Sequence, residues 1–99
     1  MSSFYAQDEG DLVQLKVNFC DYTGRTSDSF SVVFRMWDEA TGYQVLNRRV
    51  SGRLWDRCGS AYLKIPDTFA SGAYSANAAV VNRTRGGSIR NQARVFYIY

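Results

Sequence analysis

The chain has 99 residues, of which 45% are hydrophobic and 15% aromatic, and its formal net charge is +3. This length suits one domain, and the composition excludes a disordered or collagen-like chain. No apolar run approaches the roughly 18 residues that a membrane-spanning helix needs, and there is no histidine to act as a general base or metal ligand.

Polar and apolar residues alternate along most of the chain, which predicts half-buried β-strands. We expect strands near residues 12–20, 29–38, 43–50, 60–66, 73–82 and 89–98. The positions expected to face the core are Val13, Leu15, Val17 and Phe19, then Phe30, Val32, Phe34 and Met36, then Tyr74, Ala76, Ala78 and Val80. In the last strand both faces carry large apolar residues, so its inward face is ambiguous.

Turn signals separate these runs. Ala40-Thr41-Gly42 predicts a hairpin turn, and Pro66 should end a strand because it cannot donate to a ladder. Short strands joined by turns at this spacing predict an all-β fold, a single antiparallel β-sandwich domain over residues 1–99.

Cys20 and Cys58 are too few for a disulfide scaffold, and their spacing fits no zinc site. Two states remain open. The opening residues lack the basic and apolar regions of a signal peptide, so we expect synthesis in the cytoplasm, which favours reduced thiols. The alternative is one disulfide, worth about 4 kcal/mol on a chain-entropy estimate.

Catalysis is not expected. The sequence has no glycine-rich phosphate loop between a strand and a helix, and neither cysteine has a visible activating partner. Asp8-Glu9-Gly10-Asp11 is the densest acidic cluster, but it lacks the ligand spacing of a calcium loop. We therefore predict no enzyme, no cofactor and no metal site.

Charge is unevenly placed. Residues 1–47 hold three basic and seven acidic residues (−4), whereas residues 48–99 hold nine and two (+7), which together give the net +3. If the strands run up and down, alternate turns share one end of the sandwich. The residues expected at an acidic end are Asp8, Glu9, Asp11, Asp38, Glu39 and Asp67. The opposite end is expected to be mainly basic and to hold Arg25, Arg48, Arg49, Arg53, Arg57, Arg83, Arg85 and Arg90, together with the acids Asp21, Asp28 and Asp56.

Two alternatives bear on this separation of acidic and basic charge between the two ends. A tight turn at Ser51-Gly52 would move every later turn to the other end, and solvated turn charge can also serve solubility alone. The segment NRTRGGSIR, residues 82–90, holds three arginines and no acid. We expect a hairpin loop there, available to an interface, because a net charge of +3 is slight for a nucleic-acid protein and no recognition motif is present.

Four aromatic residues are candidate contacts: Trp37, Tyr43, Trp55 and Tyr62. Tryptophan, tyrosine and arginine are the usual anchors of protein interfaces. The same rings could stack on sugars, or they could only pack against other parts of the domain.

Across most of residues 8–99 the chain resembles the small immunoglobulin-like β-sandwich domains of tailed-bacteriophage virion proteins. The segments that carry the resemblance are Gly10–Val13, Asp21–Gly24, Phe30–Phe34, Asp38–Gly42, Ile65-Pro66 and Ser71–Tyr74. The last two also resemble the sugar-recognising sandwich domain attached to polysaccharide-exporting ABC transporters, and tandem domains of bacterial surface proteins.

The resemblance implies an immunoglobulin-like sandwich of six to eight short strands in a structural virion component of a capsid or tail. Its partners would be proteins, either further copies of itself or other virion proteins, reached through the arginine loops and exposed aromatics. A carbohydrate-binding module is the alternative, and a polyanion or nucleic-acid binder comes third. No membrane contact is expected.

Overall fold

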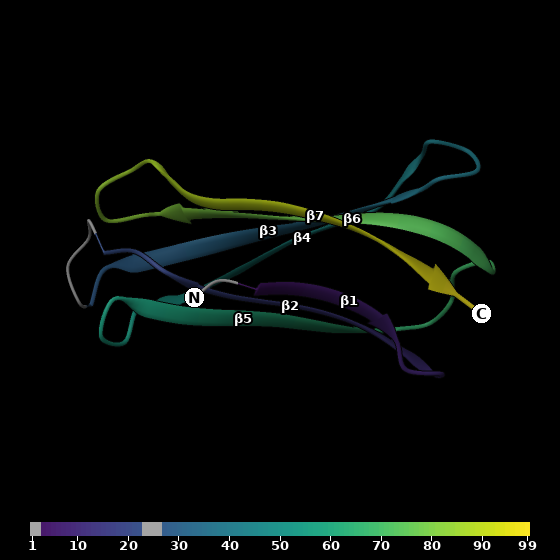
Figure 1. Ribbon diagram of the computed structural model, residues 1–99, viewed down its shortest axis with the longest axis horizontal. Coiled ribbons are helices and arrows are strands. Elements are labelled where there is room, and N and C mark those ends of the chain that lie inside the picture. Colours follow the sequence, from purple (N-terminus) through teal and green to yellow (C-terminus); the bar gives the residue numbers. More distant parts are fainter. Residues whose placement is uncertain (1–2, 23–26) are drawn as a thin grey trace.

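Seven antiparallel strands form two facing sheets in the part of the chain that the computed structural model describes, residues 3–22 and 27–99 (Figure 1). The three-stranded sheet has the order β1-β2-β5, and the four-stranded sheet has the order β4-β3-β6-β7. The strands are β1 (Ser3–Asp8), β2 (Leu12–Cys20), β3 (Ser29–Asp38), β4 (Gln44–Arg53), β5 (Cys58–Pro66), β6 (Gly72–Asn82) and β7 (Ser88–Ile98). Thr23 and Gly24 of the resemblance segment, and Arg25 of the expected basic end, lie outside the described residues.

This order confirms the predicted immunoglobulin-like β-sandwich. The first, second and fifth strands form one sheet and the third, sixth and seventh the other, as in immunoglobulin domains. The fourth strand pairs with β3 here, whereas in constant-type immunoglobulin domains it joins the sheet of the first, second and fifth strands.

The predicted core is confirmed residue for residue in β2, β3 and β6, whose inward positions are all buried. The structure also resolves the ambiguity of the last strand. Phe96 pairs with buried Tyr74 and Ile98 pairs with Gly72, so both point inward, whereas Tyr97 lies on the outer face. Cross-strand partners share a face, which is why the orientation of β6 fixes that of β7.

The six expected strands are present, with ends that lie within two residues of prediction except at the far end of β4. The seventh, β1, was missed because it is only six residues long and Phe4 is its one large buried residue.

Gly52 continues β4 instead of making a tight turn, and the chain reverses between Trp55 and Cys58. Alternate turns therefore share an end, and the molecule extends 42 Å along its longest axis, with 23 and 19 Å across it.

Beneath the β4–β5 turn, two phenylalanine rings close one end of the core. Phe19 and Phe30 meet edge to face with their centroids 4.9 Å apart. Glycines give these rings room: a Cβ on Gly52 would lie 2.9 Å from Phe30, and one on Gly59 would lie 3.1 Å from both rings. The β4–β5 turn therefore rests on a tightly packed end of the core.

Candidate functional site: the two ends of the sandwich

The β4–β5 turn presents a tryptophan on a rigid support. Trp55 and Cys58 exchange two backbone hydrogen bonds, of 2.7 and 3.0 Å, around Asp56 and Arg57. Both central residues have positive φ, 51° and 66°, which is the mark of a type I′ hairpin turn. Glycine or asparagine usually occupies such positions, so the conformation of Arg57 is uncommon and needs support from its surroundings.

That support comes from the neighbouring strand. The backbone N–H of Asp21 donates to the carbonyl of Arg57 at 2.7 Å, and a disulfide joins Cys20 to Cys58. The two cysteines are direct register partners in β2 and β5. The expectation of reduced thiols is therefore wrong for this structure, because antiparallel pairing brings the two Cα atoms within 3.9 Å, a proximity that sequence spacing does not reveal.

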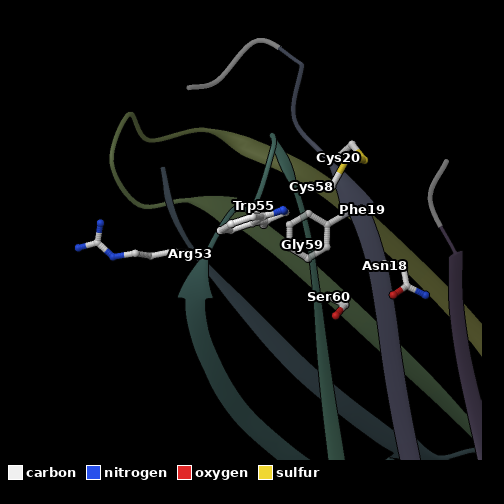
Figure 2. Close-up of a pocket in the computed structure, with 8 residues that line it drawn as sticks. All are labelled: Asn18, Phe19, Cys20, Arg53, Trp55, Cys58, Gly59 and Ser60. Carbon is white, nitrogen blue, oxygen red and sulfur yellow. A yellow bond between two sulfur atoms is a disulfide. The ribbon is translucent and has the colours of Figure 1, made fainter. Parts of the chain in front are cut away.

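Trp55 is 86% exposed and lines two shallow clefts. The larger, of about 520 Å³, is lined by Asn18, Phe19, Cys20, Arg53, Trp55, Cys58, Gly59 and Ser60. Figure 2 shows the indole beside Phe19 and Gly59, with the disulfide nearby and the Arg53 side chain extending away. The smaller cleft, of about 380 Å³, is lined by Ser27, Leu54, Trp55 and Asp56. Trp55 is therefore an exposed indole that borders two clefts.

At the same end, NRTRGGSIR forms the predicted hairpin, anchored by Asn82, whose side chain is buried. Its Nδ2 donates to Asp21 Oδ2 at 3.1 Å and to Asp28 Oδ2 at 3.0 Å. Its Oδ1 accepts from the backbone N–H groups of Thr84 and Arg85 at 2.9 and 3.0 Å. The asparagine thus ties the β6–β7 turn to the segment that precedes β3.

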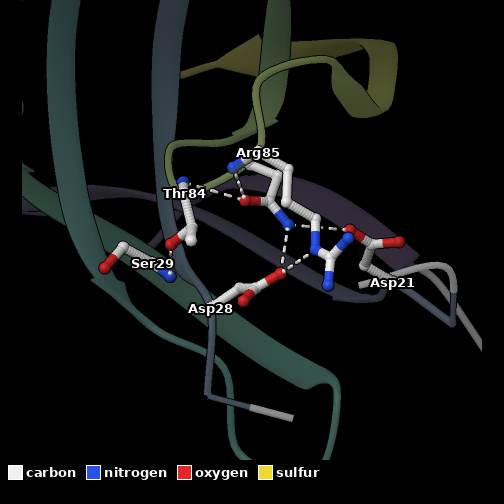
Figure 3. Close-up of polar contacts among 6 residues, drawn as sticks. Asp21, Asp28, Ser29, Thr84 and Arg85 are labelled. Atoms are coloured by element: carbon white, nitrogen blue, oxygen red, sulfur yellow. Dashed lines mark hydrogen bonds and ion pairs between the residues drawn. The ribbon is translucent and has the colours of Figure 1, made fainter. Parts of the chain in front are cut away.

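Arg85 also contributes to this anchor. Its Nε donates to Asp28 Oδ2 at 2.9 Å, and Asp28 is only 4% exposed (Figure 3). Thr84 Oγ1 accepts from the backbone N–H of Ser29 at 2.8 Å. Arg85 therefore has a structural role that the sequence did not indicate, although its side chain is partly exposed.

The expected basic end needs a correction. Arg48 and Arg49 do not lie there, because β4 runs on through Gly52 and places them opposite Phe34 and Val33, midway along β3. They occupy an edge strand, where positive charge discourages pairing with other sheets. The arginines that are exposed at the end itself are Arg53, Arg57, Arg83 and Arg85, beside the acids Asp21, Asp28 and Asp56, as expected. This end is a mixed surface with an exposed tryptophan.

The opposite end is acidic, as predicted, and is bound together by backbone contacts. Asp67 N–H donates to the Asp11 carbonyl at 3.0 Å, and Glu39 N–H to the Ala73 carbonyl at 3.1 Å. The last residue, Tyr99, donates its N–H to Asp8 Oδ2 at 2.9 Å. The residues gathered here are Asp8, Glu9, Asp11, Asp38, Glu39 and Asp67. No lysine or arginine occurs in its turns, residues 8–12, 38–44 and 66–72.

Two carboxyl groups of this acidic end have shifted pKa values. The Tyr99 N–H, with help from that of Gly10, lowers the pKa of Asp8. Partial burial raises the pKa of Asp67, and the neighbouring Asp8 carboxylate raises it further. Asp67 is thus the member of the pair that protonates first as the pH falls.

Exposed tyrosines accompany these acids. Tyr43 follows the acidic β3–β4 turn, and Tyr97 and Tyr99 stack with their ring centroids 6.3 Å apart. Tyr97 and Tyr99 were not among the predicted contacts, because the inward face of β7 could not be chosen from sequence. This acidic–aromatic end therefore carries both carboxylates and exposed tyrosine rings.

The remaining predicted aromatics lie away from Trp55. Trp37 is half-buried on the outer face of the four-stranded sheet, opposite Ser75. Tyr62 is exposed midway along β5 on the outer face of the other sheet, opposite Lys16. The structure therefore does not join the four candidates into one patch.

No protein-family model matches the chain, and no curated protein is significantly similar to it. Within residues 3–22 and 27–99, no three metal-binding side chains are grouped so that they could hold an ion. The same residues contain no helix that is long and apolar enough to cross a bilayer. The geometry of the two ends is therefore the basis for a functional proposal.

Proposed function

We propose that this protein is a non-enzymatic interaction protein that takes its place in a protein assembly by docking Trp55 into a partner. The virion capsid or tail implied by the resemblance is the setting we propose for that assembly. The single observation that carries the proposal is a tryptophan 86% exposed on a turn that a disulfide and the backbone hydrogen bond from Asp21 to Arg57 hold in place.

Preorganisation suits Trp55 to act as an anchor. A turn that is already fixed loses little conformational entropy on binding, so more of the interaction energy appears as affinity. Tryptophan anchors that become fully buried are commonly worth about 2–4 kcal/mol on truncation to alanine. Arg53 and Arg57 are exposed two residues before and after Trp55 in the chain, and arginine suits the polar rim of such a contact.

A photo-crosslinking amino acid at position 55, introduced in the cells or particles where the protein accumulates, tests the proposal. We expect discrete protein adducts at position 55. The same substitution at Tyr62, an exposed aromatic residue on a sheet face, is the matched control and should give none. Equal labelling at both positions, or no protein adduct at position 55, would contradict the proposal.

Carbohydrate binding is the second candidate, and one observation favours it. The cleft of about 520 Å³ is lined by the indole together with Asn18, Ser60 and Arg53, so hydrogen-bonding residues share a cleft with a ring that could stack on a sugar. In a Trp37→Phe background Trp55 is the sole tryptophan, so oligosaccharides that bind there should change its fluorescence. Silence across a broad glycan panel would count against this candidate.

A further inference from the structure

We propose that the partner is a second copy of this chain, and that the acidic–aromatic end of one molecule receives the Trp55 end of the next. This inference rests on the proposed function, since it names the surface into which Trp55 docks. It commits to a head-to-tail contact between opposite ends of the same fold.

The donating end offers one exposed indole and exposed arginines, and it also carries the exposed carboxylate of Asp56. Trp55 and Arg57 belong to the β4–β5 turn, Arg53 ends β4 and Arg83 lies in the β6–β7 turn at the same end, and all four residues are exposed. The nearby carboxylate of Asp28 is buried in the hydrogen bonds with Asn82 and Arg85. Arginine favours both planar contacts with carboxylates and stacking on aromatic rings.

The receiving end offers the complementary groups. Its carboxylates come from three turns, and Tyr43, Tyr97 and Tyr99 are 75%, 59% and 89% exposed. Carboxylates pair with guanidinium groups, and tyrosine faces attract both guanidinium groups and an incoming indole. Because the turns here lack any lysine or arginine, two acidic ends would repel each other.

The geometry excludes a contact within one molecule. The two ends lie at opposite extremes of the 42 Å axis, so only another copy can bring them together. A contact between different surfaces of identical chains is heterologous, and it continues as a filament unless it closes as a ring. In Figure 1 the β4–β5 and β6–β7 turns lie at one extreme, and the C-terminus and the turns after β1 and β5 at the other.

The size of the end sets the strength of the contact. A cross-section of 23 × 19 Å is about 440 Å² on each partner, or about 900 Å² in total. Stable complexes usually bury about 1,200–2,000 Å², so a single contact should be weak and sensitive to salt. We expect dissociation constants in the range of about 0.1–1 mM, with persistent chains where neighbouring copies are held together by a larger assembly.

Two complementary variants test the inference. Trp55→Ala disables the donating end, and the triple reversal Glu9→Lys, Asp11→Lys and Glu39→Lys disables the receiving end at exposed positions. By sedimentation at up to about 1 mM, a range matched to the expected weak contact, wild type should self-associate and each variant alone should stay monomeric. An equimolar mixture should form one-to-one heterodimers and nothing larger. Tyr62→Ala is the control and should associate like wild type, and far-ultraviolet circular dichroism checks that every variant is folded.

The outcomes separate this inference from the proposed function. A monomeric wild type, or association of wild type without pairing in the mixture, overturns the head-to-tail contact. If position 55 nevertheless crosslinks to a different protein, Trp55 is an anchor for a foreign partner and the proposed function stands. If neither the mixture nor the crosslinker shows a protein contact, both proposals fail.

Discussion

Replacing Arg85 with alanine should destabilise the fold, although the residue lies in a surface turn. The change removes the 2.9 Å hydrogen bond from Nε to Asp28 Oδ2 and leaves that carboxylate, 4% exposed, with a weaker set of partners. Hydrogen bonds to charged groups contribute about 1.5–3 kcal/mol, and loss of one partner of a buried pair costs about 3–5 kcal/mol.

Two features place the expected cost near the lower of these ranges. The Arg85 side chain is 43% exposed, so solvent screens the ion pair, and Asn82 Nδ2 still donates to the same oxygen at 3.0 Å. We therefore expect a loss of about 2 kcal/mol in the free energy of unfolding.

Urea unfolding at pH 7 measures this loss, provided that the slope against urea is unchanged. Arg83→Ala in the same turn is the matched control, and because Arg83 is exposed it should cost less than about 0.5 kcal/mol. Equal stabilities for the two variants would refute the assignment of Arg85 to the buried anchor.

Three further predictions concern stability. Replacing Cys20 and Cys58 with serine should lower the free energy of unfolding by about 4 kcal/mol, because the disulfide closes a loop with a sequence separation of 38, as chemical denaturation would show. Asp67→Asn should be more stable than wild type at pH 7. Because the pKa of Asp67 is raised, its protonated form stabilises the fold below the ordinary value of 3.8, and this stabilisation is lost as the pH rises through the folded-state pKa and the carboxyl ionises. Asparagine does not ionise, so the advantage of the variant over wild type should vanish in unfolding experiments below about pH 3.8. Gly52→Ala should cost about 1–3 kcal/mol in thermal or urea unfolding, since its Cβ would lie 2.9 Å from a buried phenylalanine ring, and an unchanged midpoint would contradict that packing.

Much of the fold follows from the sequence because one face of each long strand is apolar. The alternation in β2, β3 and β6 specified both the strands and their buried positions. Strand β1 was not predicted because it has a single large buried residue, Phe4, and one residue makes no periodic pattern. The turn at Asp56 and Arg57 contains no glycine, so the local sequence provided no signal for the positive φ of these two residues.

The candidate site was less accessible to sequence reasoning, because it depends on contacts between distant segments. The hydrogen bonds that tie Asn82 and Arg85 to Asp28 span 54 and 57 residues. Composition marked the arginines as a group, but only strand register shows that Arg48 and Arg49 lie midway along β3 rather than at the Trp55 end. The acidic end was predicted correctly because its members flank predicted turns.

Sedimentation equilibrium of the wild-type chain across a range of concentrations, at low and at high salt, tests head-to-tail assembly most directly. Charge-matched ends predict a weight-average mass that rises with protein concentration at low salt and falls back toward the monomer as salt screens the contact. A mass equal to that of the monomer, 11.2 kDa, at every concentration and both salt levels would contradict assembly through the two ends.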